Sequence, residues 1–540
     1  MKPEEEFGMD RGLDFQTDDE ENQAETIEEG QDGYESDSTI SSPRPSDFAI
    51  DSYTTSWPQS YRQSMDMYTS CVTPSNVGFI GGSFTGISSS FLSSSLFKKH
   101  HSDSGSPLSK PLFDPTFWDR DEVPPASFHP RHSVASSPRY SYLELPQSRE
   151  CSYAQSVLNG VNILCGVGLL STPFAVKEGG WVTLLVLFVF GVISCYTGIL
   201  LKTCLESSPG LKTYPDIGQA AFGVYGRSVI AIILYIELYV CSVEYITLMS
   251  DNLSSLFPNV EMSFAGIYLD CHHIFAIAMT ILVLPTVWLR DLSLLSYLSA
   301  GGVISTLLLV LCLLWVGAVD KVGFHPSGTA LDLVNLPVAI GICGFCYAGH
   351  SVFPNIYSSM KNPSQFSSVL MASFVICFFL YSGVAVCGFL MFGESMESQF
   401  TLNLPQNFVA SKVAAWTTAV NPLSKYALTM TPVALSLEEL LPSAKLRTHC
   451  ASIVIRTALV LSTLYVALAV PFFGFMLAFI GSFLTMLVAL IFPCACYLRI
   501  LRGRLNRFQI AVCIFIITVG VACSCSGTYS AIRKIADNMA

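Results

Sequence analysis

Charged residues are scarce in this 540-residue chain: Asp, Glu, Lys and Arg together make up 13% of it, and hydrophobic residues make up 51%. A soluble domain ordinarily carries about 25% charged residues, so the composition excludes a typical cytosolic enzyme. The sequence also lacks a P-loop, which leaves nucleotide-driven pumping without support. No constellation of catalytic side chains is present, and we expect no enzyme activity.

A clustered basic surface is missing as well. The formal net charge is −12, but residues 1–150 hold 25 of the 41 acidic side chains and 11 of the 29 basic ones. This N-terminal part therefore carries −14 and the remainder +2. The acidity says nothing about a substrate, and a nucleic-acid partner is not expected.

Cysteines are numerous but form no disulfide or metal-binding pattern. Seventeen of the 18 follow residue 150, nearly all in apolar runs, where a thiol behaves as a small hydrophobic group. Cys343 and Cys346 have the spacing of a redox or zinc pair, but no second pair accompanies them. We expect local packing for these two, and neither a metal site nor a cofactor.

Residues 1–150 combine acidic clusters with many Ser and Pro residues. Such a composition buries too little apolar surface to offset the entropy of ordering, and it lacks the layout of a signal peptide. We expect a disordered cytosolic tail that is either inert or bound by kinases and sorting adaptors. The candidate sites for these partners are Ser42, Ser106, Ser133, Ser137 and residues 142–145.

From residue 151 onward, apolar runs are long enough to cross a lipid bilayer, which takes about 20 residues. The sequence predicts an all-α polytopic membrane protein with a transmembrane domain over residues 151–531 and a short C-terminal tail over 532–540. The eleven predicted spans cover residues 152–176, 181–201, 228–250, 272–289, 295–319, 334–357, 366–392, 408–437, 452–470, 474–498 and 508–531.

The distribution of Lys and Arg over short loops predicts the orientation in the membrane. Loops on the side of the N-terminal tail carry eleven of these residues and the opposite side carries five, including Arg533 and Lys534. We therefore expect a cytosolic N-terminus and, with eleven spans, a C-terminus on the other side. Asn252 begins the only Asn-x-Ser/Thr sequence for N-glycosylation, and we expect it outside the cytosol.

Two predicted spans, the first and the sixth, have glycines near their middle and a proline five residues after the last of them. Each opens a group of five spans. Interrupted helices at corresponding places in two halves are typical of the binding site of an inverted-repeat transporter. Glycines that only allow close helix packing are the alternative. The residues concerned are Gly166, Gly168 and Pro173 in the first span and Gly341, Gly344, Gly349 and Pro354 in the sixth.

An unwound helix frees N–H and C=O groups at mid-membrane, and these need partners from protein, water or substrate. The N–H groups around Gly166, Val167 and Gly168 can bind a carboxylate, and freed carbonyls can bind an ammonium group. Paired breaks therefore predict a zwitterion such as an amino acid as substrate. The predicted substrate-binding residues are Asn159, Asn162, Gly166, Val167, Gly168, Gly341, Gly344, Phe345 and Tyr347.

Ionisable side chains inside a membrane are costly and mark functional sites. Glu237 and Glu244 lie seven residues apart on one helix face. They are the predicted proton carriers, unless each is tied to a helix carbonyl or an arginine. His350 follows the glycines of the sixth span and either titrates during transport or is a hydrogen-bonded structural residue.

Residues 159–175, Asn-Gly-Val-Asn-Ile-Leu-Cys-Gly-Val-Gly-Leu-Leu-Ser-Thr-Pro-Phe-Ala, resemble the amino acid/auxin permease superfamily, as do residues 178–181 and 214–218. Together with Asn-Pro-Leu-Ser-Lys-Tyr-Ala at residues 421–427 and with Glu438 and Glu439, they are most similar to its plant and fungal vacuolar amino acid transporter branch. The resemblance spans roughly residues 149–531 and leaves out the tail.

This resemblance implies eleven spans in a five-plus-five inverted repeat of the leucine-transporter type, with one additional helix. It also implies proton-coupled transport of mainly neutral amino acids, by antiport across the vacuolar membrane. In such a fold a sodium ion bridges the first and eighth spans. We expect the ammonium group of Lys425 to take its place, so that transport needs no sodium, unless Lys425 snorkels to the interface.

Two other functions stay open at this point. An amino acid sensor would signal through the tail, with net flux incidental. A plasma-membrane symporter would import protons together with amino acids.

Overall fold

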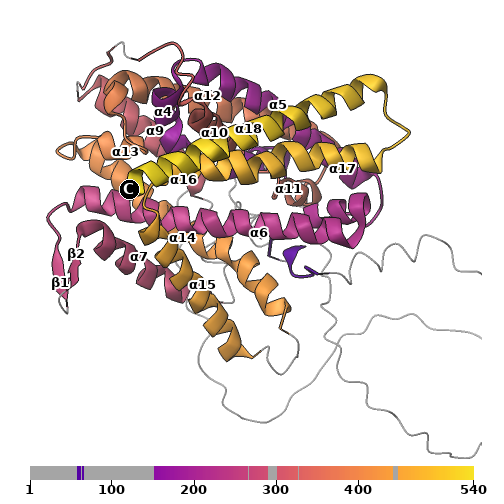
Figure 1. Ribbon diagram of the computed structural model, residues 1–540, viewed down its shortest axis with the longest axis horizontal. Coiled ribbons are helices and arrows are strands. Elements are labelled where there is room, and N and C mark those ends of the chain that lie inside the picture. Colours follow the sequence, from indigo (N-terminus) through magenta and orange to yellow (C-terminus); the bar gives the residue numbers. More distant parts are fainter. Residues whose placement is uncertain are drawn as a thin grey trace, which may run out of the picture. The chain divides into compact units, whose positions relative to one another are not determined.

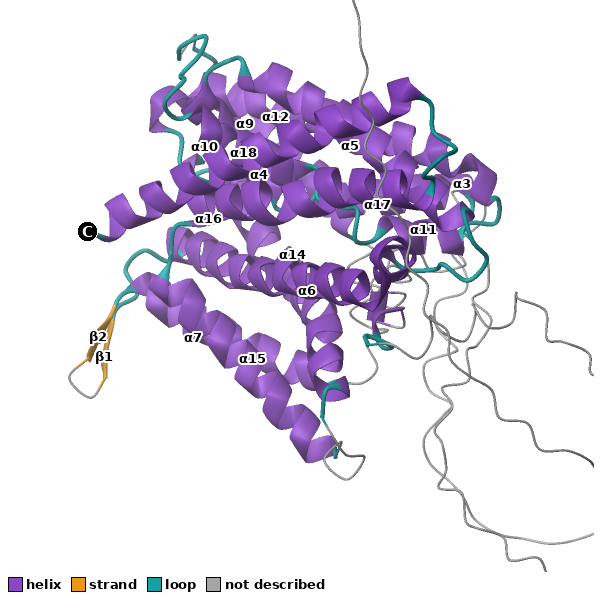
Figure 2. Cartoon of the chain, turned by 45° about the vertical axis from the view of Figure 1, so that its right-hand side comes forward, coloured by secondary structure: helices purple, strands orange, loops and turns teal. Residues whose placement is uncertain are grey.

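The computed structural model describes residues 57–62, 64–65, 151–264, 267–289, 301–320, 322–325, 328–441 and 448–540. In these ranges the chain is almost wholly helical (Figures 1 and 2). One short antiparallel hairpin, β1 (Met262–Phe264) and β2 (Ile267–Leu269), joins two of the helices, with Met262 opposite Leu269.

All eleven predicted spans contain helix. By length and apolar composition, seven of the described helices are able to cross a membrane, or eight if the bent pair α3 and α4 is one span. The described residues therefore belong to a polytopic helical membrane protein. The helices are α3 (Tyr153–Leu164), α4 (Gly168–Gly179), α5 (Thr183–Glu206), α6 (Tyr214–Leu256), α7 (Cys271–Trp288), α9 (Gly302–Ala318), α10 (Leu336–Cys346), α11 (Phe353–Ser359), α12 (Phe366–Phe392), α14 (Val409–Glu439), α15 (His449–Ala469), α16 (Phe473–Ile480), the π-helix η3 (Gly481–Ile491), α17 (Phe492–Ile500) and α18 (Arg507–Met539).

Three short elements complete the connections around α12 and α14. They are the 3₁₀ turns η1 (Pro363–Gln365) and η2 (Gly393–Ser395) and the single-turn helix α13 (Phe400–Asn403). Each lies at one end of a long helix.

Polar residues define where several helices begin. Ser152 starts α3 with a capping box completed by Gln155, and Thr213 does the same for α6 with Asp216. Reciprocal hydrogen bonds of this kind satisfy N–H groups that the first helical turn leaves unpaired. Each of these helices therefore starts where a polar pair precedes its apolar run.

The long helix α6 packs along α14, and α7 and α15 lie against α6 (Figure 2). On another side, the hydroxyl of Tyr214 at the start of α6 donates to the carbonyl of Val488 in η3 at 2.6 Å. Large apolar side chains such as Ile304 in α9 and Phe379 in α12 remain exposed. In a helical membrane protein such side chains face lipid, which is as apolar as they are.

Helix α18 continues to Met539, so the residues expected to form a C-terminal tail, 532–540, are helical up to that point. That they form a tail beyond the last span stays a prediction. The eighth span is a single helix, α14, that runs through Pro422 and Pro432. In an apolar bundle, neighbouring helices and side chains compensate the backbone groups that a proline frees.

Asn252 is 0% exposed, so the expectation of a glycosylation site is not supported. Its amide donates to Gln399 at 2.6 Å, and its side-chain oxygen accepts from Thr401 at 2.8 Å. A glycosylated asparagine needs a surface position. Here the side chain instead joins α6 to α13.

Part of the N-terminal tail packs against the helices. Tyr61 and Met65 are 1% and 0% exposed, so the prediction of disorder is wrong for residues 57–62 and 64–65. The other residues of the tail lie outside the described ones, and so do the predicted kinase and adaptor sites.

Candidate functional site

The first predicted break is present. Helix α3 ends at Leu164, α4 begins at Gly168, and the two helices are bent by 51°. Cys165, Gly166 and Val167 connect them. The backbone therefore leaves the helix at two of the three positions predicted from the glycine pattern, and Gly168 is the first residue of the second half-helix.

The backbone groups at this break are unevenly satisfied. The N–H of Gly166 donates to the carbonyl of Leu164 at 2.7 Å. Among the described residues, the N–H groups of Val167 and Gly168 make no hydrogen bond, and no side chain caps the start of α4. Unpaired N–H groups and the helix dipole together favour an anion at this point.

The second break lies at Gly349, the last glycine of the pattern, and not at Gly341 and Gly344. Helix α10 continues to Cys346, α11 begins at Phe353, and residues 347–352 lie between them. Gly341 and Gly344 are therefore helical. A Cβ on Gly341 would stand 2.3 Å from the carbonyl oxygen of Ala478 in α16, so this glycine allows two helices to pack backbone against backbone.

Gly168 and the end of α10 bring the two broken spans together. A Cβ on Gly168 would lie 3.2 Å from Cys346 Sγ and 3.3 Å from Phe345 Cδ1. The Cys346 thiol is also 3.7 Å from the carbonyl oxygen of Gly168. Phe345, a predicted substrate-binding residue, thus lies beside the unpaired N–H groups of α4.

A tyrosine that the sequence did not single out links the two breaks. The Tyr381 hydroxyl of α12 contacts the last carbonyl of α3, that of Leu164, and donates to the last carbonyl of α10, that of Cys346, at 2.7 Å. The hydroxyl of Thr306 in α9 lies 3.3 Å from the next freed carbonyl, that of Cys165, and 2.9 Å from the carbonyl of Gly302 in its own helix. Hydroxyl groups therefore lie against the carbonyls of Leu164 and Cys165 at the first break, whereas its two N–H groups remain available.

Lys425 and Asn162 meet at Gly302, the first residue of α9. Asn162 Oδ1 and Lys425 Cε lie 2.1 Å and 3.5 Å from the point where a Cβ on Gly302 would stand. Lys425 is 8% exposed, which argues against snorkelling. No described residue forms an ion pair or hydrogen bond with it. The oxygen of Asn162 has no hydrogen-bond partner among the described residues, and the same holds for the oxygen of Asn159 in α3.

The two predicted proton carriers are both buried in α6. Glu237 accepts a hydrogen bond of 3.4 Å from Thr485 in the π-helix η3. Glu244 is 2% exposed, and its Oε2 has no partner within the described part of the chain. Neither is tied to an arginine there, although no described contact links them to Lys425 either.

His350 and Tyr347 lie in the second break and face α5 and α12. Nε2 of His350 is 3.1 Å from the carbonyl of Ser194, which only accepts, so Nε2 carries the proton. Tyr347 stacks on Phe374 with ring centroids 5.5 Å apart. These contacts favour the structural interpretation of His350 and place Tyr347 in ordinary aromatic packing.

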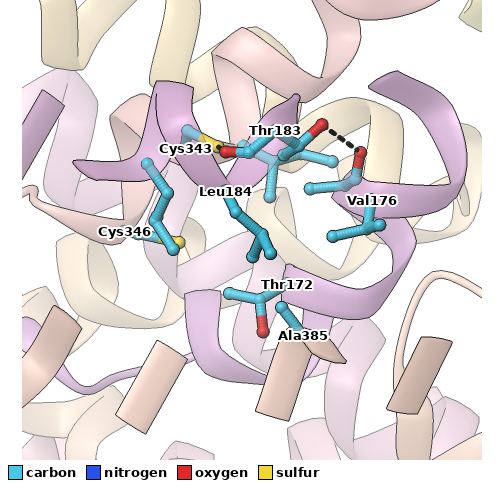
Figure 3. A pocket seen from close by; sticks show the side chains of 10 residues that line it. Thr172, Val176, Thr183, Leu184, Cys343, Cys346 and Ala385 are labelled. Carbon is cyan, nitrogen blue, oxygen red and sulfur yellow. Dashed lines mark hydrogen bonds between the residues drawn. The ribbon is translucent and has the colours of Figure 1, made fainter. Parts of the chain in front are cut away.

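A small apolar pocket, without space even for a water molecule, lies next to the junction, between α4, α5, α10 and α12 (Figure 3). Its two threonine hydroxyls are already used: Thr172 donates to the carbonyl of Leu169, and Thr183 to that of Ala175. With no free polar group, this pocket suits side-chain packing better than a zwitterion.

Cys343 and Cys346 are both buried, as expected for packing residues. Across the described ranges, no group of three or more His, Cys, Asp and Glu side chains is arranged to hold a metal ion.

Comparisons with known proteins agree with the residue patterns. The family model described as transmembrane amino acid transporter protein matches residues 149–533. Amino acid transporter AVT1D of Arabidopsis thaliana is 58% identical over 94% of this chain and 91% of that protein. Amino acid transporter AVT1C of the same plant is 52% identical over 98% of both chains. The vesicular GABA transporter of Caenorhabditis elegans is 28% identical over 71% of this chain and 79% of that protein.

A solved structure of a Na⁺-coupled sialic acid symporter is 11% identical, covers 70% of this chain and 89% of its own, and has a TM-score of 0.42. That likeness is too distant to bear on the fold. The family match covers more than two thirds of the sequence, and the Arabidopsis proteins also align with the N-terminal residues that the motif resemblance left out. The chain therefore belongs to the transmembrane amino acid transporter family, alongside the AVT1 amino acid transporters.

Proposed function

We propose that this protein is a proton-coupled secondary transporter of mainly neutral amino acids, working as an antiporter across the vacuolar membrane. The observation that carries the proposal is the first-span break, where two unpaired N–H groups start a half-helix beside the end of a second broken span. Such a site is built for the charged groups of a small zwitterion rather than for an apolar ligand.

The substrate carboxylate is placed on the N–H groups of Val167 and Gly168, where the dipole of α4 favours negative charge. The substrate ammonium needs an acceptor, and the unpaired Oδ1 of Asn162 on the preceding half-helix supplies one. Phe345 borders the same junction and would limit the size of the substrate side chain. Specificity among neutral amino acids would then depend on the space around Phe345.

For the membrane architecture we propose eleven spans, of which the first ten form two inverted repeats of five. The broken first and sixth spans then stand at equivalent places in the two repeats. The Lys and Arg bias supports a cytosolic N-terminus and a lumenal C-terminus. Rocking of one group of helices against the other would open the junction to each side in turn.

Proton coupling is assigned to the buried glutamates of α6. Glu244 is preferred because one of its carboxyl oxygens is buried without a partner, a costly arrangement that protonation relieves. We assign Lys425 to the electrostatic role that a sodium ion would otherwise have between the first and eighth spans. Its burial beside α3 and α9 supports this assignment.

The vacuolar location is supported by the motif resemblance and by the likeness to a transporter that is named as vesicular. A plasma-membrane symporter would use the same site with the opposite direction of coupling. Imaging of the tagged protein, followed by flux measurements on isolated vacuoles, separates the two.

The decisive experiment is uptake of radiolabelled neutral amino acids into proteoliposomes with an imposed pH gradient and without sodium. We expect accumulation when the compartment that receives the amino acid is acidic, and its collapse when a protonophore removes the gradient. Accumulation that strictly requires sodium, or that ignores the pH gradient, would contradict the proposed coupling.

A further inference from the structure

Residues 57–62 and 64–65 form a short docked segment at the end of the helix bundle where α6 begins and α14 ends (Figure 1). Its core is apolar, because Tyr61 and Met65 are almost fully buried. The rings of Trp57 and Tyr61 lie against Tyr235 of α6, with centroids 5.8 Å and 5.9 Å away. We refer to residues 57–62 and 64–65 as the docked segment.

A buried arginine is directed at this segment. Arg227 of α6 is 4% exposed. Its Nη1 pairs with Asp216 on the same helix, whereas its Nε donates to the carbonyl of Trp57 at 3.1 Å and its Nη2 to that of Pro58 at 3.0 Å. Charged donors left unpaired in a buried place are costly. Arg227 therefore needs the backbone carbonyls of the docked segment as acceptors for two of its donors.

A carboxylate at the end of α14 binds the next two residues. Glu439 accepts hydrogen bonds from the N–H of Gln59 at 2.8 Å, from the N–H of Ser60 at 3.1 Å and from the hydroxyl of Ser60 at 2.9 Å. The indole of Trp57 also donates to the carbonyl of Ser436 at 3.2 Å. The adjacent Glu438 instead pairs with Arg456 inside the bundle at 2.8 Å. Glu439 thus binds the docked segment, whereas Glu438 pairs with an arginine of the helix bundle.

Tyr61 extends the contact to the second broken span. Its hydroxyl donates at 3.3 Å to the carbonyl of Ser351, which lies in the unwound residues 347–352. Burial, and the nearby Tyr235 and acidic groups, raise the pKa of Tyr61, so the hydroxyl keeps its proton and remains a donor. The docked segment therefore bonds α6, α14 and the sixth-span break at the same time.

We propose that the docked segment is a built-in plug, which holds the transporter closed at this end and must leave before transport can proceed. The proposal rests on the proposed transport function. Alternating access requires one group of helices to move against the other. A peptide bonded both to the α6 and α14 pair and to the break at Ser351 resists that movement, and it does so without any external partner.

The plug is tethered, so its release is reversible. Residues 66–150 link it covalently to α3, and a tethered ligand rebinds in an intramolecular step, at a high effective concentration. The docked and released states then differ by a few individual contacts. Small changes in those contacts shift the populations and hence the rate of transport.

The first test compares two tryptophan variants of the full chain. Trp57→Ala removes an aromatic contact and a hydrogen bond of the plug, and we expect the initial rate of pH-driven uptake of radiolabelled neutral amino acids to rise about three- to tenfold. Trp118→Ala makes the same chemical change elsewhere in the tail and should leave the rate unchanged. Ser60→Asp, which places a second carboxylate against Glu439, should raise the rate as Trp57→Ala does. Equal uptake rates in the unmodified chain and in these three variants would overturn the proposal of a plug.

The second test holds the plug in place. Ser60→Cys and Glu439→Cys are combined and joined by a short bifunctional methanethiosulfonate, with each single variant as control. We expect the joined protein to lose most of its uptake and dithiothreitol to restore it. Full uptake with the link formed would overturn the proposal. Absence of uptake in the unmodified chain and in every reduced variant would instead refute the proposed function, and the plug with it.

Discussion

The two broken spans share one sequence pattern but differ in structure. In the first, three residues separate two helices and glycine lies at the break itself. In the sixth, six residues separate the helices, and Gly341 and Gly344 lie inside α10, against α16 and η3. The first break exposes backbone donors, whereas the sixth span uses two of its glycines for packing and has only Gly349 in the unwound residues. A glycine pattern alone does not separate these two uses, because both need a residue without a side chain.

Substitutions at Gly168 and Gly341 test this difference between the two breaks most directly. Gly168→Leu would place a branched side chain against Cys346 and Phe345, and we expect transport to fall by at least about 100-fold. Folded protein should still be produced, because a small shift of Phe345 makes room for the new side chain. Gly341→Leu would force two helix backbones apart, and we expect loss of folded protein. Size-exclusion chromatography in detergent together with uptake assays checks both.

Normal uptake by Gly168→Leu would refute the role of the first break. Folded and inactive Gly341→Leu would show instead that the sixth-span glycines also belong to the site. A Cβ at Gly168 is tight rather than impossible, and its backbone dihedral is not of the kind that requires glycine. The expected loss therefore comes from contact with α10.

A second test compares the effects on transport of replacing Lys425, near the break of the first span, and His350, in the break of the sixth span. We expect Lys425→Ala to lower transport by about 30- to 100-fold even at saturating substrate, because a buried charge near the first break is lost. Lys425→Arg should keep part of the activity. His350→Asn, which keeps a donor for Ser194, should cost less than about threefold.

Uptake without sodium, measured for the unmodified protein and these three variants, provides the readout. Full proton-driven activity of Lys425→Ala would defeat the assignment, and so would strong sodium dependence of the unmodified chain.

Variants of the two α6 glutamates separate proton coupling from substrate binding. Glu244→Gln should abolish pH-driven accumulation while exchange of amino acid across the membrane persists, because the amide keeps the shape but carries no titrating proton. Glu237→Gln should have a smaller effect, since Thr485 already stabilises that carboxyl group. Normal accumulation by the double variant would remove both residues from the mechanism.

The smallest expected effect concerns the tyrosine that joins the breaks. Tyr381→Phe removes the donor shared by two helix-terminal carbonyls, and the net value of such a bond predicts about a tenfold lower rate. Tyr347→Phe is the matched control, because its buried hydroxyl has no partner among the described residues. It should stay within about twofold of the unmodified rate. If the two variants behave alike, Tyr381 does not couple the breaks.

The sequence was sufficient to locate the helices, because long apolar runs have few other solutions. It also located the first break, where Gly166 interrupts the run, although the proline at residue 173 lies inside α4. It could not predict which side chains complete the site. Thr306, Gly302 and Tyr381 come from other spans, and each looks like an ordinary helix residue until three-dimensional packing brings it to the break.

The composition of the tail does not reveal its ordered residues, for a related reason. Its acidic, serine-rich composition describes the average of 150 residues, and the docked segment is a short aromatic stretch within it. Such a stretch gains order only from partners that lie far away in sequence, here Arg227 and Glu439. Composition averaged over a long window cannot reveal a contact of this kind.

Helix α6 has a consequence for determining sidedness experimentally. The docked segment binds near its start, and the β1–β2 hairpin follows its end, where Met262 and Tyr268 are exposed. The backbone of α6 is non-helical at Gly223, and the part that follows, residues 224–256, is about 50 Å long at 1.5 Å per residue, which exceeds the hydrocarbon core of a bilayer. An epitope inserted in the hairpin and a second one before residue 57 would therefore mark opposite compartments. Antibody access to intact and permeabilised vesicles would then assign each face without any measurement of flux.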